Sequence, residues 1–343
     1  MGSAKAKGRN RVLRLTVCVI LLITAASAAV LFWSVYSPAG FNGALKVQNG
    51  RVVNRFGQPY VLQGVSTTSL YKTSQYLDKY GFRDLKKDWD VNCIRLVVKT
   101  FDYDGYCVND EKFRAEIDSR IDWGVRCATE CGLYVIIDWH VLNDRNPNRF
   151  RSDAVDFFAR MAEKYKDHDN VIFELCNEPN GDNTTWAEVR EYADIVTDVI
   201  REKGNDALVI VGTPEWCRRI TDPVEEPVFD LNTAYSLHFY AASHGEELRK
   251  TTEDALKAGL PVIVSEFGIS EYDGNGRLAK DEGEKWLELL DRYDVGRICY
   301  CLKSGTDLID MFKDNCKKTN SWESGDLSEY GAWIREQYTK TSE

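Results

Sequence analysis

Short apolar runs alternate with amphipathic stretches along most of the chain. The runs are rich in Val and Ile, a pattern typical of buried parallel strands. They predict strands near residues 60–65, 91–98, 133–138, 171–177, 207–212, 234–239, 261–266 and 297–302. The stretches between and after them predict helices near residues 76–88, 111–130, 152–167, 185–203, 246–258, 279–293 and 326–338.

Eight strands that alternate with helices predict an α/β fold, the (β/α)8 TIM barrel, in which helices wrap a closed parallel sheet. The alternative is an open doubly wound sheet, but no glycine-rich phosphate loop follows any predicted strand. The Asn49-Gly50 turn between alternating residues predicts a short β-hairpin ahead of the barrel. A length of 343 residues suits one such domain, placed at residues 45–343, although two domains remain possible.

The start of the chain has a different composition. Residues 1–14 carry five basic side chains and no acid, and residues 15–33 follow without a charge. In a helix this uncharged run would be about 28 Å long, close to the thickness of a bilayer's hydrocarbon core. We therefore expect a basic cytoplasmic tail (1–14), a transmembrane signal anchor (15–36) and a linker (37–44), with the globular domain outside a cell membrane that the chain crosses once. Small residues at 25–29 leave a cleaved signal peptide and a secreted protein as the alternative.

Composition narrows the classes of partner. A formal charge of -10 argues against nucleic acid, which would be repelled, whereas a neutral sugar polymer is compatible with it. The ten cysteines are scattered and several fall in predicted strands, so we expect mostly free thiols and at most one bridge. Cys127 and Cys131 lie four residues apart on a predicted helix, but no second pair completes a zinc site. We expect neither a metal nor a cofactor.

Two apolar runs lead directly into a carboxylate, the first ending at Glu178 and the second at Glu266. A parallel barrel gathers the carboxyl ends of its strands at one face, so we expect these two side chains to face each other across a cleft. Glycoside hydrolysis requires such a pair, one protonated acid for the leaving oxygen and one ionised group opposite it. A lone Glu at a strand end would more often be an ordinary solvated residue.

Five blocks carry a family resemblance. They are Tyr134-Val135-Ile136-Ile137-Asp138-Trp139-His140, Asn177-Glu178-Pro179-Asn180-Gly181, Gly212-Thr213 with Trp216, Leu237-His238-Phe239-Tyr240-Ala241, and Val264-Ser265-Glu266-Phe267-Gly268. In this order they resemble glycoside hydrolase family 5 and, within it, the bacterial endo-1,4-β-glucanases, or cellulases. The resemblance covers about residues 45–300. It implies a (β/α)8 barrel that hydrolyses with retention of anomeric configuration.

The resemblance also implies roles for single residues. By position, Glu178 is the acid/base, Glu266 is the nucleophile, and Asn177 hydrogen-bonds the sugar 2-hydroxyl. In a retaining enzyme the two carboxyl groups lie about 5–5.5 Å apart, so that one attacks while the other protonates the departing oxygen. The implied substrate-binding residues are Arg95, His140, Asn177, Trp216, His238, Tyr240 and Tyr300.

Within that set the implied contacts differ. Arg95 and Tyr240 are similar to groups that keep the nucleophile ionised and oriented. The two histidines match positions that line the central sugar site, although either one alone is more often structural. Trp216 matches a residue that stacks on an acceptor-side sugar, and Tyr300 stands in the place of a stacking Trp. Trp139, in contrast, is expected to belong to the core.

The chain departs from the family pattern on the donor side, where the sugars on the non-reducing side of the cut bind. Thr68-Ser69 and Lys72 replace a His-Gly pair and a Trp, and Lys99 stands where a Tyr is common. The segment that begins at Arg297 replaces a Trp-rich segment. We therefore expect an altered grip on the donor side, with an effect that the sequence does not specify.

The leading hypothesis is a monomeric retaining endo-1,4-β-glucanase that acts on cellulose or a related β-linked polysaccharide. One alternative is a related β-mannanase or xyloglucanase. Another is a catalytically weak glycan-binding surface protein, suggested by the missing donor-side aromatic residues. A metal-dependent barrel hydrolase is disfavoured, because the first strand lacks histidine ligands.

Overall fold

The structure, a computed structural model, describes residues 38–340. The expected tail (1–14) and signal anchor (15–36) lie outside this range. Among the described helices, none combines the length and the apolar character that a membrane crossing requires.

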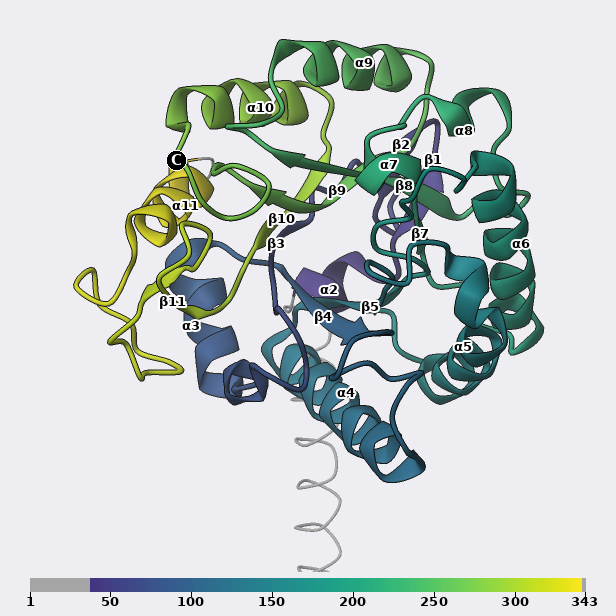
Figure 1. The fold of residues 1–343 in the computed structure, drawn as a ribbon, viewed down its shortest axis with the longest axis horizontal. Helices are drawn as coiled ribbons and strands as arrows, with labels where there is room; N and C mark the ends of the chain where they lie inside the picture. Colours follow the sequence, from purple (N-terminus) through teal and green to yellow (C-terminus); the bar gives the residue numbers. More distant parts are fainter. Residues whose placement is uncertain (1–37, 341–343) are drawn as a thin grey trace, which may run out of the picture.

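Eight parallel strands close into a barrel in the order β10-β3-β4-β5-β6-β7-β8-β9 (Figure 1). They are β3 (Gln63–Ser66), β4 (Cys93–Lys99), β5 (Tyr134–His140), β6 (Val171–Glu174), β7 (Val209–Gly212), β8 (Thr233–Tyr240), β9 (Val262–Gly268) and β10 (Gly296–Tyr300). The last strand pairs with the first, Arg297 lying opposite Gln63, and this pairing closes the sheet. The predicted barrel is confirmed.

Each of the seven predicted helices is present on the outside of the barrel (Figure 1). They are α3 (Lys79–Trp89), α4 (Glu111–Cys131), α5 (Arg151–Tyr165), α6 (Trp186–Glu202), α9 (Glu246–Lys257), α10 (Lys280–Arg292) and α11 (Glu329–Lys340). Local sequence sets their ends. At the start of α6, Thr185 and Glu188 form a reciprocal capping box, and Gly132 ends α4 in the left-handed conformation with a φ of 68°.

Shorter elements connect these units. They are α2 (Pro38–Asn42), β1 (Lys46–Gln48), β2 (Arg51–Val53), η1 (Ser74–Tyr76), η2 (Pro147–Phe150), α7 (Pro214–Cys217), α8 (Asp222–Glu225), β11 (Ser304–Gly305) and β12 (Phe312–Lys313). The predicted hairpin is β1–β2, and its Asn49 and Gly50 both have positive φ. The expected linker differs from its prediction, because residues 38–42 form a short helix. There Ala39 is buried, and its N–H donates to Gly132 O.

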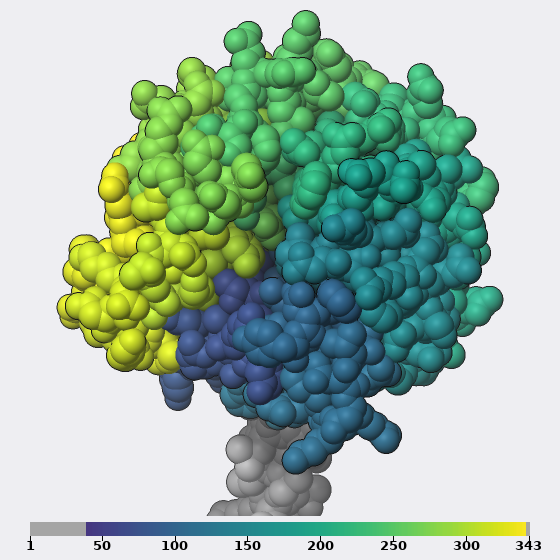
Figure 2. Space-filling model, in the orientation of Figure 1, coloured from purple at the N-terminus to yellow at the C-terminus, as the bar shows by residue number. Residues whose placement is uncertain are grey.

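Segments distant in sequence meet where the barrel closes. In Figure 2 the yellow C-terminal part of the chain lies beside the blue segment that includes α3. Thr319 and Asn320 both donate to the carboxylate of Asp78, the residue that caps α3. The C-terminal segment is therefore tied to the start of the barrel.

The barrel interior has an apolar lower layer and a polar upper layer. Near the start of each strand, the side chains that point into the barrel are mostly apolar and pack together. Among them are Cys93, Ile136, Ile172, Ala234, Ile263 and Ile298. Two positions further along the same strands stand Arg95, Asp138, Glu174, Ser236 and Ser265, each of them fully buried. Because side chains alternate along a strand, this pattern directs a set of polar groups into the upper barrel.

The layers test the expected places of Arg297, on the donor side, and of Trp139, in the core. Arg297 lies at the start of β10, where it is buried and bonded to Gln63 and Asp291. It belongs to the lower end of the barrel, so its assignment among the altered donor-side residues is wrong.

Trp139 is fully buried, as expected for the core. The nine cysteines of the described region are free, and eight are buried.

The outer core generates a stability prediction. Phe158 on α5 is fully buried, with ring centroids of Phe157 and Phe173 at 5.2 and 5.8 Å. We expect Phe158→Ala to lower the free energy of unfolding by about 3–5 kcal/mol, because the lost ring leaves a cavity. Phe229 is 82% exposed, and Phe229→Ala should change the value by less than about 0.5 kcal/mol. Urea denaturation measures both, and similar values for the two variants would contradict the core assignment.

Candidate active site

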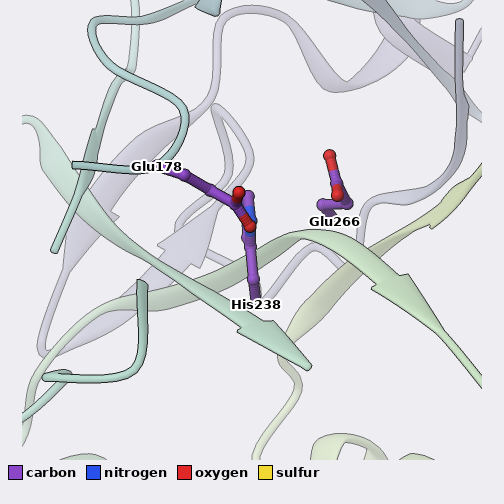
Figure 3. Close-up of side chains that lie close together, drawn as sticks. All are labelled: Glu178, His238 and Glu266. Atoms are coloured by element: carbon purple, nitrogen blue, oxygen red, sulfur yellow. The ribbon is translucent and has the colours of Figure 1, made fainter. Parts of the chain in front are cut away.

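The two carboxylates predicted to meet do lie together at the mouth of the barrel. Glu266 is part of β9, and Glu178 lies in the loop after β6. One carboxylate oxygen of Glu178, one of Glu266 and a ring nitrogen of His238 all lie within 4.8 Å of one another. Figure 3 shows the side chains of Glu178 and His238 meeting, in line with their hydrogen bond, and Glu266 standing apart from them. Retaining glycosidases separate their carboxyl groups by about 5–5.5 Å and inverting ones by about 6.5–9.5 Å, so the spacing fits retention.

Backbone contacts hold the loop that carries Glu178. The N–H groups of Asn177 and Glu178 donate to the carbonyls of Trp139 and Val141, which extends the sheet contact past the end of β6. Gly212 on β7 permits this path, because a Cβ there would come within 2.2 Å of Cys176 O. The position of Glu178 is thus fixed by its neighbours on both sides.

A bulge in β9 lets two consecutive side chains face the barrel interior. Opposite the two-residue step from Ser236 to His238 on β8, β9 takes three residues, from Ile263 to Glu266. The extra residue breaks the strict alternation of side chains. As a result both Ser265 and Glu266 reach hydrogen-bonding partners inside the barrel.

Arg95, fully buried in the middle of β4, is the cation of the site. Its Nη1 lies 3.1 Å from Glu266 Oε2, and its Nε lies 2.7 Å from Glu174 Oε2. Its Nη2 donates to Asn177 Oδ1 at 2.6 Å and lies 3.1 Å from Asp138 Oδ2. A buried charge is tolerated only when it is paired and hydrogen-bonded, and Arg95 meets this condition with three carboxyl groups at once.

The proposed nucleophile is oriented through both of its oxygens. Oε2 of Glu266 accepts from Arg95, and Oε1 accepts from the Tyr240 hydroxyl at 2.7 Å. Hydrogen bonds from a cation and from a phenol stabilise a carboxylate in one orientation. Arg95 and Tyr240 thus occupy the places that the sequence implied for them.

The proposed acid/base has different surroundings. Its Oε1 lies 2.9 Å from Nδ1 of His238, and the side chain has no ion pair with an Arg or Lys in the described region. Burial raises the pKa of Glu178 to about 7, although Arg95 opposes the change. At neutral pH a large fraction of this group is therefore protonated and can act as an acid.

His140 and Asp138 form a second pair. Nδ1 of His140 lies 2.7 Å from Asp138 Oδ2. Burial lowers the pKa of His140 well below its usual value, and burial raises the pKa of Asp138 to about 7. Four carboxyl groups surround the guanidinium of Arg95, namely those of Asp138, Glu174, Glu178 and Glu266. Because ionised carboxylates repel one another, the four cannot all be ionised at once. The raised pKa values indicate that Glu178 and Asp138 are each partly protonated at neutral pH.

Sequence reasoning did not assign three members of the site, namely Asp138, Glu174 and Ser265. Two of them are carboxylates inside strands that are otherwise apolar, and this placement was the available signal, since buried acids are rare unless they are paired. The contribution of Ser265 depends on the bulge in β9, and no pattern in the sequence reveals a bulge.

Trp216 lies on the Glu178 side of the cleft. Its backbone N–H donates to Pro179 O, in the loop that carries Glu178, and the residue is 44% exposed. Glu215, Trp216 and Cys217 all have a φ near +60°, a left-handed turn that holds the ring outward. Beside it lies a groove of about 740 Å³, lined partly by Gly181 and Arg218. This exposed ring is suitably placed to stack on a sugar of the leaving group.

The changed positions lie on the opposite side. In the ring of eight strands, β3 stands four places from β7, and β4 stands four places from β8. Lys99 ends β4 in register with His140, and Tyr300 ends β10 beside Ser66. Lys72 follows β3 and interacts with Asp104 and with the ring of Tyr103.

Thr68 also follows β3, and its hydroxyl donates to that of Thr73. Two lysines, Lys72 and Lys99, therefore stand in this region of the rim, where the family pattern has aromatic residues.

The three residues of Figure 3 could in principle approach a cation, but their facing atoms have protein partners. Nδ1 of His238 and Oε1 of Glu178 face each other, and Nε2 of His238 lies 2.9 Å from Ser265 Oγ. Both oxygens of Glu266 accept from protein donors. Two carboxyl groups with different partners therefore face each other at the mouth of the barrel.

Comparison with known proteins gives a consistent family match. Residues 53–306 match the model for cellulase (glycosyl hydrolase family 5). The chain is 38% identical to Endoglucanase A of Butyrivibrio fibrisolvens, over 88% of this chain and 70% of that protein. It is 36% identical to Endoglucanase N of Pectobacterium atrosepticum, over 96% and 73%.

Solved structures agree with this match. Cellulase Cel5C_n superposes with a TM-score of 0.83 at 33% identity, over 89% of this chain and 94% of that one. The catalytic domain of Thermobifida fusca endoglucanase Cel5A, in complex with cellotetraose, gives a TM-score of 0.82 at 29% identity, over 88% and 99%.

The central cation generates a prediction about stability. Arg95→Met would leave three buried carboxyl groups without their counter-charge, so we expect the free energy of unfolding to fall by about 3–5 kcal/mol. The control is Arg51→Met, which removes an exposed pair with Asp294 and should cost less than about 1 kcal/mol. Urea denaturation at pH 7 compares the two. If Arg95→Met is as stable as Arg51→Met, the guanidinium does not hold the site together.

Proposed function

Because the chain belongs to glycosyl hydrolase family 5, the cellulase family, we propose that it is an endo-acting glycosidase that cleaves β-1,4-glucosidic bonds in cellulose or related β-glucans with retention. The observation that carries this proposal is the pairing of Glu178 and Glu266 within 4.8 Å, with unlike surroundings. Glu266 accepts hydrogen bonds from Arg95 and Tyr240, whereas Glu178 is buried beside His238, whose pKa burial lowers to about 4. Two acids with divided roles are what retaining hydrolysis needs.

The first step forms a glycosyl-enzyme. An oxygen of Glu266 attacks the anomeric carbon, and the bond from that carbon to the leaving oxygen breaks. Glu178 gives its proton to this oxygen, so the leaving chain departs as a neutral alcohol. Trp216, on the Glu178 side of the cleft, would hold that chain.

The second step releases the sugar. Glu178, now ionised, removes a proton from a water molecule whose oxygen attacks the anomeric carbon from the side that the leaving group vacated. The bond to Glu266 breaks and restores its carboxylate, which Arg95 and Tyr240 again stabilise. Two displacements at one carbon give net retention.

Asn177 is held ready for a sugar hydroxyl. Its Oδ1 accepts from Arg95 at 2.6 Å, and one N–H donates to Val141 O at 3.2 Å. An amide has two N–H donors, so one remains for the substrate. This contact fits the role that the family resemblance implied, a hydrogen bond to the 2-hydroxyl that strengthens in the transition state.

The donor side leaves room for a different specificity. Lys72 and Lys99 stand on that rim in place of aromatic residues, which favours neither a mannan nor a xyloglucan by itself. A glycan-binding protein without activity would not require a buried acid beside an oriented carboxylate. We therefore place β-glucan hydrolysis first and retain the related specificities as outcomes of the substrate test.

Loss of either carboxyl group should abolish hydrolysis. We expect Glu178→Gln and Glu266→Ala each to lower the release of reducing ends by at least about a thousandfold, because each removes one half of the reaction. Glu247→Gln on the exposed face of α9 is the control and should retain full activity. The assay uses carboxymethylcellulose, mixed-linkage β-glucan, xyloglucan and mannan side by side. Retained turnover in either catalytic variant, or turnover of mannan alone, would contradict the proposal.

The raised pKa of Glu178 generates a pH prediction. The protonated form is the acid, so kcat/KM on a neutral β-glucan should fall tenfold per pH unit above about 7. The value of kcat/KM falls because the protonated form of Glu178, which acts as the acid, is lost as the pH rises. Initial rates at low substrate concentration, from pH 5 to pH 9, measure this limb. A profile that stays level up to pH 9 would show that another group donates the proton.

We also propose a location and a state of assembly. The uncharged run at residues 15–33, after a basic tail, supports a single-pass membrane protein with its catalytic domain outside the cell, and we take that domain to be monomeric. Fractionation of cells, with N-terminal sequencing, tests the anchor. The full chain should sediment with membranes, whereas a product beginning near residue 30 and free in the medium would support secretion instead.

A further inference from the structure

A chain of hydrogen bonds runs behind the catalytic pair and reaches Glu178 through His238. It begins at Glu178 Oε1, 2.9 Å from Nδ1 of His238, and continues from Nε2 of His238 to Ser265 Oγ, also 2.9 Å. Ser265 Oγ then donates to Glu174 Oε1 at 2.6 Å. Ser265 and Glu174 are fully buried, and His238 is 2% exposed. Their protons can therefore be assigned without solvent as a partner.

Arg95 has only hydrogen-bond donors, so every group that it contacts must accept. Its Nε and Nη2 donate to the two oxygens of Glu174, at 2.7 and 3.2 Å. Burial raises the pKa of Glu174, and the ion pair with Arg95 opposes this change. A carboxyl group whose two oxygens both accept from a guanidinium is best described as ionised. Glu174 is therefore an acceptor for Ser265.

The hydroxyl of Ser265 determines which ring nitrogen of His238 carries the proton. It has one proton and two lone pairs, and the proton goes to Glu174. The lone pairs then accept from Nε2 of His238 and from the hydroxyl of Ser236, which lies 2.5 Å away. Burial lowers the pKa of His238 to about 4, so the ring is neutral at pH 6–7. A neutral ring with its proton on Nε2 has a bare Nδ1, which can only accept.

We propose that Ser265 and Glu174 are positioning residues that fix the Nε2–H tautomer of His238 and so hold the acid's proton on Glu178. The inference rests on the proposed function of Glu178. A protonated Glu178 donates to the bare Nδ1. Once the proton has passed to the leaving oxygen, the Glu178 carboxylate faces a lone pair, and this repulsion favours removal of a proton from the attacking water. The network thus supports both roles of Glu178, as the acid in the first step and as the base in the second.

Other charged groups near Glu178 act through space. They come from five neighbouring elements and are Arg95 on β4, Asp138 on β5, Glu174 on β6, Arg218 after β7, and Glu266 on β9. Arg95 and Arg218 lower the pKa of Glu178, and Glu174 raises it. Among the described side chains, His238 alone shares a hydrogen bond with the Glu178 carboxyl. The tautomer of His238 is therefore the local control on that proton.

The direct test is ¹⁵N NMR of the imidazoles at pH 6, in a protein with four histidines. In the wild type we expect the proton of His238 on Nε2. In Ser265→Ala, Nε2 loses its acceptor, and we expect a shift toward the Nδ1–H tautomer, which can donate to an ionised Glu178. Ser265→Thr keeps the hydroxyl and should restore the wild-type signal. An Nδ1–H tautomer in the wild type would overturn the proposal, whatever the activity of the protein.

The second readout is the alkaline limb of kcat/KM. Ser265→Ala should lower its midpoint by about one pH unit, the effect of one hydrogen bond gained by an ionised Glu178. Ser265→Thr should return it. Ser270→Ala, a buried serine beyond the end of β9, is the control and should leave the limb in place. A uniform loss of activity in Ser265→Ala, with the midpoint unchanged, would show a merely structural role.

A further variant covers the case in which Ser265→Ala does not fold. Glu174→Gln keeps the shape of the side chain but replaces one oxygen by an NH2 group. The amide oxygen would keep the shorter bond from Arg95 Nε, which places the NH2 group where Oε1 stands. Ser265 would then accept from this NH2 group and donate to Nε2 of His238. This reversal should place the ring proton on Nδ1 and lower the midpoint of the alkaline limb. A wild-type tautomer and midpoint in this variant would contradict the proposed direction of the chain.

Discussion

The ion pairs of Arg95 are the interaction on which the active site depends. One buried guanidinium contacts Glu174, Asp138 and Glu266 and also orients Asn177. Without this cation, three carboxyl groups could not be placed in the interior of a barrel, because each would lose its hydration without compensation. With it, Glu266 accepts a hydrogen bond from a cation, whereas Glu178 lies beyond the direct hydrogen bonds of Arg95 and has a pKa that burial raises to about 7. A single charge thus gives the two carboxyl groups different surroundings, which suit the two roles proposed for them.

The barrel makes this arrangement possible through its layers. Below, apolar inward-facing residues fill the interior, and above them polar residues from the same strands meet around Arg95. Parallel strands bring their carboxyl ends to one rim, so residues as distant as Arg95, Glu178 and Glu266 become neighbours. The bulge in β9 adds Ser265 to this set beside Glu266. The lower layer provides rigidity, and the upper layer holds the chemistry.

Much of this could be predicted from the sequence, for reasons that particular residues illustrate. The apolar runs determined all eight strands, and the runs before Glu178 and Glu266 placed both acids at one rim. Contacts of Arg95 and Tyr240 with Glu266 match those implied by the family resemblance. What could not be predicted depends on register and packing. Arg297 was misplaced because alignment does not show which end of a strand a residue occupies, and the helix at residues 38–42 forms where Ala39 packs against the barrel.

In the proposed mechanism, Glu266 attacks the sugar while Glu178 carries the proton. A cellobioside with fluorine at C2 and a good leaving group tests it directly, because fluorine slows both steps and the leaving group restores the first. Mass spectrometry of the digested protein should find one glycosyl adduct, on the peptide that contains Glu266. An adduct on Glu178, or turnover of the reagent in which no covalent intermediate ever accumulates, would contradict the account.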